Sequence, residues 1–398
     1  MKHFIFLFFL IISKNLYANE NDLIIKAYKD SLNFVKENKI NPPLTSYYLS
    51  KSSNIAYKIT KKYKHQKIRS DIFYYTFISN FILFNKNLNT NKLQIEINNI
   101  INKNLISNTD LDFIGNKLKK YYDKNYELLL KAQANNYVHK GSWEPTPPLY
   151  ANPLYPQFGT LPTEINHDYS ILKKLPKKIN LNNSQLIEEA NYIKNIGGVS
   201  SNQRTIDQTS IAYFWAAESG SVTPPGMWIL FTLNELKENQ FLNNILIMKI
   251  VSNALHDAAV ITWYLKYSYD LLRPVTYIQK YMNDTQWMPL LKTPPFPSFT
   301  SGHSTFSATV SVILDTLFKP SKSLKLSSEG YPDRYYQSYQ KAALEAGLSR
   351  IYGGIHYPMD NTYGLYIGSE IGCEYVKKYL KIRQCKNNMF YIEKQSFF

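Results

Sequence analysis

The chain has 398 residues and a formal net charge of +16, with 46 lysines and arginines against 30 acidic residues. That length is enough for two or three average domains or one large helical one. The lysines are spread along the chain among many asparagines, without a sustained basic block, so a compositional bias explains the charge better than a nucleic-acid partner, and none is expected. A positive field would still attract anionic substrates.

The first residues are typical of a secretory signal peptide. Lys2 precedes nine apolar residues at 4–12, and a polar stretch follows that ends in Ala18. Nine apolar residues are too few to span a bilayer, which favours a cleaved signal at 1–18 over a membrane anchor. Leu16 is a less usual residue at the third position before the cut, so the exact cleavage site stays open. We expect a secreted, periplasmic protein.

Apolar residues recur at helical spacing through most of the chain. Residues 21–137 are helical almost throughout, and a long proline-bearing loop follows at 143–179. Helical patterns resume at 201–217, 227–237 and 243–269, and the last is expected at 361–380. No alternating strand pairs are evident, and the later apolar runs are too short or too interrupted to predict an integral membrane segment after signal removal. The sequence therefore predicts an all-α fold, with a helical region at 19–140 and a catalytic region at 141–398.

Lys266 and Arg273 are the first of three groups of residues suited to holding an oxyanion. Seven residues make nearly two helical turns, so both side chains are expected on one helix face. Pro274 disfavours helical geometry at Arg273, which places the guanidinium where the helix ends. Arginine binds two oxygens through a planar fork, whereas lysine supplies a point charge.

Ser301, Gly302 and His303 form the second group, where a proline-rich loop passes into an apolar helical run. Free backbone N–H groups and the positive dipole end at a helix start favour an anion. Gly302 allows the backbone to approach oxygen atoms, and the Ser301 hydroxyl adds a donor. His303 is then placed to give or take a proton.

The third group is Arg350, His356 and Asp360, with Gly353 and Gly354 predicting a tight loop between them. Asp360 lies four residues after His356 and is expected to accept its Nδ1–H, which leaves Nε2 as a nucleophile or a ligand. Each residue alone would more often be structural. All three groups in this order indicate an oxyanion site.

Together these groups resemble the three-part signature shared by vanadium-dependent haloperoxidases, bacterial class A acid phosphatases and type 2 phosphatidic acid phosphatases. The resemblance implies helical bundles of the haloperoxidase and acid phosphatase type. It implies that vanadate or phosphate is held by Lys266, Arg273, Ser301, Gly302 and Arg350. His356 would be the vanadium ligand or the phosphatase nucleophile, and His303 the acid or base.

Other segments are similar to the bacterial vanadium haloperoxidase-like subgroup. These are the Trp-x-Pro-Thr-Pro-Pro segment that begins at Trp143 and the stretches 197–216 and 221–228, so the resemblance covers roughly residues 140–381. One departure is Thr300, where the family usually has a proline, and it removes no functional group.

Two aromatic residues bear on which reaction runs. Trp263 and Phe296 stand where the chloroperoxidase-like pattern also has Trp and Phe beside the halide, although ordinary aromatic packing explains either one equally well. The resemblance implies a vanadate-dependent haloperoxidase that oxidises halide with hydrogen peroxide. The alternatives are a secreted acid phosphatase, which hydrolyses phosphomonoesters through a phosphohistidine without a cofactor, and a non-catalytic oxyanion-binding protein.

Cys373 and Cys385 are the only cysteines. A helix running through both would hold them about 18 Å apart, beyond disulfide reach, so an unpaired state is favoured unless the tail after about Tyr379 folds back. Their spacing gives no support for a metal site. His256 and Asp257 are neighbours that point about 100° apart on a helix, so we expect them to have core or surface roles.

Overall fold

The computed structural model describes residues 20–134, 137, 141–318, 323–385 and 390, so the expected signal peptide lies outside the described residues. Its N-terminal helices are α2 (Glu20–Glu37), α3 (Pro42–Thr60), α4 (Arg69–Phe84), α5 (Asn91–Asn102) and α6 (Asn108–Gln133). The later helices are α7 (Ser184–Ile196), α8 (Ile206–Phe214), α9 (Thr223–Leu233), α10 (Phe241–Tyr269), α11 (Pro274–Tyr281), α12 (Gly302–Phe318), α13 (Tyr339–Tyr352) and α14 (Pro358–Tyr375). The all-α prediction is confirmed. A small antiparallel hairpin, β1 (Leu324–Leu326) and β2 (Arg334–Tyr336), is the exception that the sequence did not predict.

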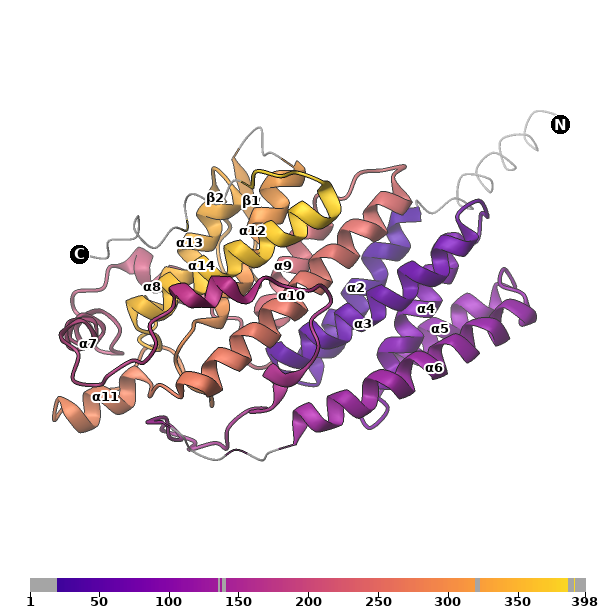
Figure 1. Cartoon of the computed structure of the whole chain (residues 1–398). Helices are drawn as coiled ribbons and strands as arrows, with labels where there is room; N and C mark the ends of the chain where they lie inside the picture. The colour runs from indigo at the N-terminus through magenta and orange to yellow at the C-terminus, as the bar shows by residue number, and fades with distance from the viewer. Residues whose placement is uncertain (1–19, 135–136, 138–140, 319–322, 386–389, 391–398) are drawn as a thin grey trace, which may run out of the picture.

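The N-terminal helices pack against the later ones, as the indigo and orange segments of Figure 1 show. Local signals start these helices: Asn41 accepts the Leu44 N–H at 3.2 Å ahead of two prolines, and Ser107 accepts the Asp110 N–H at 3.1 Å. One hydrophobic cluster includes side chains from α2 to α6 and from α10, α12 and α14. The described parts of 19–140 and 141–398 therefore share a core, and the division near residue 140 stays a prediction.

Helix α10 runs through the middle of the molecule (Figure 1). It packs against α3 and α12 and is buried on nearly every face, because its apolar residues are not confined to one stripe. Among the described residues, one stretch, Phe241–Tyr281, is long and apolar enough to cross a membrane by length and composition, and 83% of its apolar window is buried inside the protein. A central core helix accounts for that pattern.

Helices α12 and α14 are held unusually close by glycines on α14. A Cβ on Gly364 would lie 2.8 Å from the Ser301 carbonyl oxygen, and one on Gly368 would lie 2.3 Å from that of Thr305. Only glycine permits this backbone approach. The contact brings the start of α12 against the start of α14, where two of the three predicted groups lie.

The proline-bearing loop packs on the protein and contains the short turns η2 (Phe158–Thr160) and η3 (Tyr169–Lys174). His167 fixes it, because its ring lies between Asp257 of α10 and Glu374 of α14. His256 is buried beside Asp257 and contacts the Pro162 carbonyl oxygen, so both neighbours have core positions, one of the two roles expected for them.

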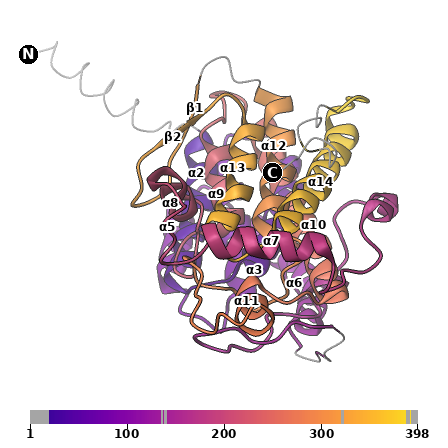
Figure 2. The ribbon, with the colours of Figure 1, turned by 90° about the vertical axis from the view of Figure 1, so that its left-hand side faces the viewer.

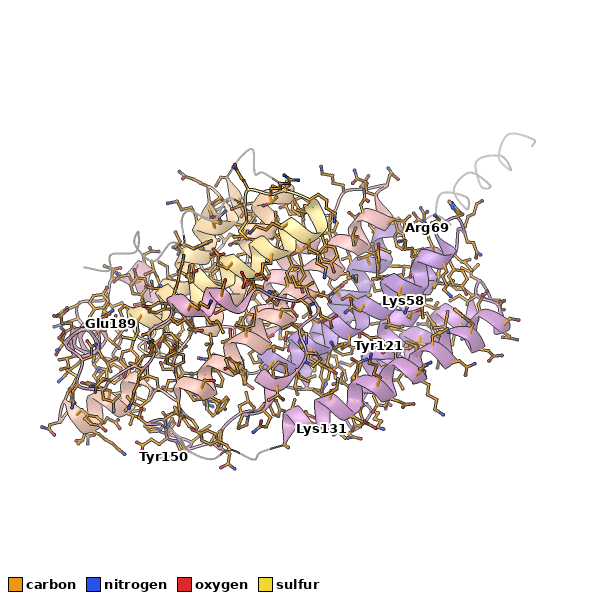
Figure 3. All side chains as sticks on the ribbon, in the orientation of Figure 1. Lys58, Arg69, Tyr121, Lys131, Tyr150 and Glu189 are labelled. Atoms are coloured by element: carbon orange, nitrogen blue, oxygen red, sulfur yellow. A yellow bond between two sulfur atoms is a disulfide. The ribbon has the colours of Figure 1, made fainter. Side chains whose placement is uncertain are left out.

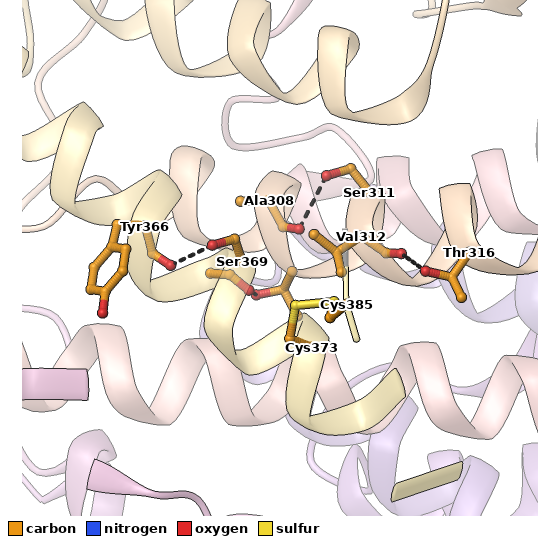
Figure 4. Close-up of a disulfide and its surroundings, with 10 residues drawn as sticks. Ala308, Ser311, Val312, Thr316, Tyr366, Ser369, Cys373 and Cys385 are labelled. Carbon is orange, nitrogen blue, oxygen red and sulfur yellow. Dashed lines mark hydrogen bonds between the residues drawn. A yellow bond between two sulfur atoms is a disulfide. The ribbon is translucent and has the colours of Figure 1, made fainter. Parts of the chain in front are cut away.

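The C-terminal expectation for the cysteines is wrong. Helix α14 ends at Tyr375, a π-helical turn continues to Leu380, and Lys381 adopts φ 60°, which ends the helical run and reverses the chain. Cys373 and Cys385 therefore lie 5.5 Å apart between Cα atoms and form a disulfide (Figure 4). The estimate of about 18 Å fails because the helix does not reach Cys385.

Candidate active site

The three predicted groups converge on one cavity of about 460 Å³. Gly302, His303, Arg350 and His356 line it, together with residues of the α2–α3 turn and the 216–219 segment. Lys266, Arg273, Ser301 and Asp360 are buried behind this wall. The structure thus brings all eight residues to one region, although it does not test their predicted roles.

His356 is oriented by Asp360, as the spacing predicted. The Nδ1 atom lies 2.8 Å from Asp360 Oδ2, while Nε2 lies 3.1 Å from Arg273 Nη1, which can only donate. These contacts assign the proton to Nδ1 and the lone pair to Nε2. Burial and the nearby guanidinium of Arg273 hold the pKa of His356 well below its usual value, so the ring is neutral. A neutral imidazole with its lone pair on Nε2, where it accepts the Arg273 Nη1–H, suits a nucleophile or a ligand.

Asp360 lies in the first turn of α14 and accepts hydrogen bonds from three donors. Its Oδ2 accepts the Ser298 hydroxyl at 2.5 Å and the Tyr357 N–H at 3.1 Å, in addition to His356 Nδ1. Burial raises the pKa of Asp360 to about 6, and the hydrogen bond from Ser298 and the charge of Lys266 oppose the rise. The carboxylate is therefore ionised at neutral pH and fixes the imidazole.

Arg273 reaches the site by a route that differs from the expected one. Helix α10 ends at Tyr269, Asp270 is left-handed at φ 48°, and Arg273 is the extended residue before α11. Lys266 and Arg273 therefore do not share a helix face. Pro274 still sets the turn, because it occupies the first position of α11.

The guanidinium of Arg273 is fully buried, and some of its N–H groups donate hydrogen bonds within the protein. Its Nε donates to the Phe296 carbonyl and its Nη1 to the Ile355 carbonyl, both at 2.8 Å. Its Nη2 is buried and has no hydrogen-bond partner among the residues that the structure describes. Burial lowers the pKa of Arg273 to about 10. An unsatisfied charged donor is costly, which indicates that an acceptor completes this site.

Lys266 has a different set of partners from the one predicted. Its ammonium donates to the carbonyl oxygens of Pro297 and Ser298 at 3.0 Å each and of Thr300 at 2.6 Å. All three donors of the group are thereby used on the 297–300 loop. Burial and the charge of Arg273 lower its pKa well below the usual value. Contact between Lys266 and an oxyanion stays a prediction, and in this structure the ammonium shapes the loop that carries Ser298.

Ser301, Gly302 and His303 lie at the start of α12, as predicted. A Cβ on Gly302 would meet only a Phe306 ring atom, at 3.6 Å, so the backbone is open towards the cavity. His303 Nε2 lies 3.0 Å from the Trp215 carbonyl oxygen, which requires a proton on Nε2 and leaves the lone pair on Nδ1. Burial and the charge of Arg350 hold the pKa of His303 well below its usual value. The ring is neutral and able to accept a proton at Nδ1.

Arg350 is in the last turn of α13 and is almost completely buried. Its Nη2 donates to the Ala212 carbonyl at 2.9 Å and its Nε contacts Ser349 Oγ at 3.0 Å. Burial lowers its pKa to about 9, and Glu218 at the cavity wall opposes this. Three buried basic side chains thus lie at this site, and two of them, Lys266 and Arg273, act on the buried carboxylate of Asp360. Such an excess of buried positive charge favours a bound anion.

Trp263 and Phe296 pack together at the cavity wall. Their ring centroids are 5.0 Å apart, and Lys266 Nζ and the Arg273 guanidinium lie 4.9 and 5.0 Å from the Phe296 centroid. The aromatic face supports both cations. The geometry accommodates ordinary packing and a halide border alike, so the halide role stays a prediction.

Sequence reasoning missed three polar residues of the site: Ser298, Glu218 and Glu189. Ser298 stands inside the Pro-Ser-Phe-Thr-Ser-Gly-His string, so its position was a usable signal. Glu218 and Glu189 are distant in sequence from the three predicted groups, and no pattern around them indicated a role. Among the described residues, no group of three or more His, Cys, Asp or Glu side chains is arranged to hold a metal ion. An oxyanion needs only the donors described above.

Comparisons with known proteins agree with this geometry. Residues 246–384 match the family model of the VCPO second helical-bundle domain. The structure is similar to that of the first bacterial vanadium-dependent iodoperoxidase, with a TM-score of 0.76 and 22% identity over 90% of this chain and 96% of that chain.

Two further solved structures share the fold. The holo-type bacterial vanadium-dependent chloroperoxidase gives a TM-score of 0.64 and 12% identity over 86% of this chain and 94% of that one. The apo-type enzyme gives 0.66 and 12% over 86% and 95%. No curated protein matches the sequence.

Proposed function

We propose that the chain is a vanadate-dependent enzyme that oxidises halide with hydrogen peroxide, and the match of residues 246–384 to the VCPO second helical-bundle domain supports this. One observation carries the proposal: Arg273 Nη2, which has no partner among the described residues, lies in the same buried site as the Nε2 lone pair of His356. A tetrahedral oxyanion would supply the acceptor for Arg273 Nη2, and its central atom would take the Nε2 lone pair as a ligand.

The residues present fit vanadate. Arg273 and Arg350 supply guanidinium donors, Gly302 leaves the backbone open, and the Ser301 hydroxyl lies beside it at the start of α12. His356 Nε2 would be the ligand to vanadium, with its tautomer set by Asp360. Bound vanadate would activate peroxide as a Lewis acid. The cations would offset the negative charge of its oxygens, which also restores the balance of the buried charges.

His303 is the residue suited to move the proton. Its Nε2–H is held by the Trp215 carbonyl, so Nδ1 accepts a proton from peroxide at the cavity and later returns it to the departing oxygen. Oxidation of one halide by one peroxide consumes one proton and yields hypohalous acid and water. Trp263 and Phe296 would form the apolar border of the halide position, where water is excluded.

The proposal is tested by dividing one purified batch and incubating half with orthovanadate. Both halves are assayed for iodide- and bromide-dependent halogenation by peroxide and for phosphomonoester hydrolysis. We expect halogenation in the vanadate-loaded half alone. Phosphatase activity that vanadate inhibits, with no halogenation under any halide, would instead show a phosphohistidine enzyme built on His356. Tight binding without either turnover would show an oxyanion-binding protein.

The compartment is part of the proposal. The N-terminal apolar run with Lys2 before it is typical of a signal peptide, and the disulfide between Cys373 and Cys385 is consistent with an oxidising compartment such as the periplasm. Fractionation of cells that express the full chain, with mass spectrometry of the N-terminus, tests it. Recovery of a chain with residues 1–18 intact in the cytosol would contradict secretion.

A further inference from the structure

Helix α7 contacts every element that carries the third group of site residues. Its Ile193 and Ile196 share a hydrophobic cluster with Ile351 of α13 and with Val275 and Ile278 of α11. At its end, a Cβ on Gly197 would lie 2.4 Å from the Cα of Gly354, which is in the loop between Arg350 and His356. Figure 2 shows α7 lying across this face of the molecule. The helix therefore packs against the segments that carry Arg273, Arg350 and His356.

Glu189 is the polar link from α7 to the start of α14. The residue, labelled in Figure 3, is 2% exposed. Its Oε2 accepts the Met359 N–H at 2.9 Å and its Oε1 accepts the Gln185 side-chain amide at 3.0 Å. Met359 is the second residue of α14, and Asp360 follows it directly.

The first turn of α14 depends on this contact for its hydrogen bonding. Pro358 has no N–H, and the Tyr357 N–H donates to Asp360. The Met359 N–H donates to Glu189, so the carboxylates of Asp360 and Glu189 both cap the same helix start. Displacement of Met359 would move Asp360, and with it the hydrogen bond that fixes His356.

We propose that Glu189 is a positioning residue for the His356–Asp360 pair, acting from α7 through the first turn of α14. The proposal rests on the proposed function only for the identity of the oxyanion. Glu189 touches neither His356 nor the cavity, so its effect on the site is transmitted by the backbone of Met359 and Asp360.

Ionisation of Glu189 is expected to act in opposite directions on the stability of the protein and on the position of α14. Burial raises its pKa to about 7, and the charge of Asp360 adds to the rise. The titratable groups that act on it or feel its charge are Asp360 and Tyr363 of α14 and Tyr357, the residue that precedes this helix. Because the pKa is raised above its ordinary value of 4.5, the ionised carboxylate costs stability as pH rises through about 7. The same ionised carboxylate binds the Met359 N–H and the helix dipole more strongly.

The test compares Glu189→Gln with Glu188→Gln, which changes the exposed neighbour on the same helix. Orthovanadate and inorganic phosphate binding are measured by calorimetry at pH 6 and pH 8, with thermal melting at each pH. At pH 6 most Glu189 is protonated, so the Glu189→Gln variant should bind within about twofold of the parent. At pH 8 it should bind several-fold more weakly and melt at a higher temperature than the parent. Equal binding at both pH values, or an equal loss at both, would overturn the proposal, because a packing role does not depend on the charge.

A second measurement needs no oxyanion. Glu189→Ala should speed hydrogen exchange at residues 357–361 by about tenfold or more, whereas Glu188→Ala should leave it unchanged. Unchanged hydrogen exchange in the Glu189→Ala variant would overturn the proposed positioning role of Glu189. If the parent protein binds neither orthovanadate nor phosphate, the proposed function fails, and the exchange result still decides the role of Glu189.

Discussion

His167 offers a quantitative test of how the loop at 143–183 is held on the helices. Its Nε2 lies 2.8 Å from Asp257 Oδ2 on α10, and its Nδ1 contacts a Glu374 carboxylate oxygen on α14. The side chains of His167 and Asp257 are completely buried. A ring with a carboxylate at each nitrogen is an imidazolium. The two hydrogen bonds and charges raise its pKa to about 9 against the cost of burial.

The sign and size of the effect follow from that pKa. A histidine whose pKa is raised by folding contributes stability that is complete below its ordinary 6.5 and is lost as pH rises through about 9. At about 1.4 kcal/mol per pKa unit, the rise from 6.5 to about 9 amounts to about 3 kcal/mol. Burial raises the pKa of Asp257 and offsets part of this, so the net value at neutral pH is smaller.

Urea unfolding of the parent protein and of His167→Gln at pH 7, 8, 9 and 10 measures the effect. The difference in free energy of unfolding between the parent and His167→Gln should shrink by about 2.5 kcal/mol across this range, whereas the alkaline loss due to buried tyrosines is common to both proteins. Both cysteines are in the disulfide, so no free thiol reshuffles it at alkaline pH. His65→Gln, in the exposed turn after α3, is the control and should keep the parental slope. A flat profile in the parent, or an equal slope in His167→Gln, would refute the reasoning.

Three further outcomes are expected. His356→Ala should abolish both halide oxidation and phosphoester hydrolysis while near-UV circular dichroism stays native, and substantial turnover would show that Nε2 is not essential. His303→Ala should bind orthovanadate within about tenfold of the parent but lose roughly a hundredfold or more in turnover, because the change removes a proton-transfer group and not a ligand. Complete loss of orthovanadate binding, measured by calorimetry, would show that His303 is a ligand instead. Cys385→Ser should lower the free energy of unfolding by about 3 kcal/mol through loss of the 12-residue crosslink, and an unchanged urea midpoint would contradict this.

Sequence reasoning found the residues of the site mainly where the governing interactions are local. His356 and Asp360 are four residues apart, and their hydrogen bond needs only the turn into α14. Ser301 to His303 lie at a helix start because an apolar helical run follows a proline-rich loop. Pro274 likewise ends the extended segment at Arg273 wherever α10 stops.

Three expectations failed for reasons that local pattern does not contain. Helix α7 was not predicted, because its short apolar stripe gains stability by packing on α11 and α13. Two turns of continuous helix between Lys266 and Arg273 were expected, but Asp270 adopts a left-handed conformation, and Gly141 and Trp143 of the preceding loop hydrogen-bond to it. The disulfide depended on where α14 stops and how the tail returns.

The amino-acid sequence by itself determined the all-α class, the residues of the proposed oxyanion site and the tautomer-setting pair, since these follow from helical periodicity and short spacings. Tertiary structure alone decided which donors remain free. Lys266 donates to three loop carbonyls, Arg273 Nη2 has no partner within the described part of the chain, and Glu189 reaches α14 from 170 residues away. The physical reason is that the partners of a buried charge are supplied by segments distant in the chain, and burial, which sets its pKa, exists only once those segments have packed together.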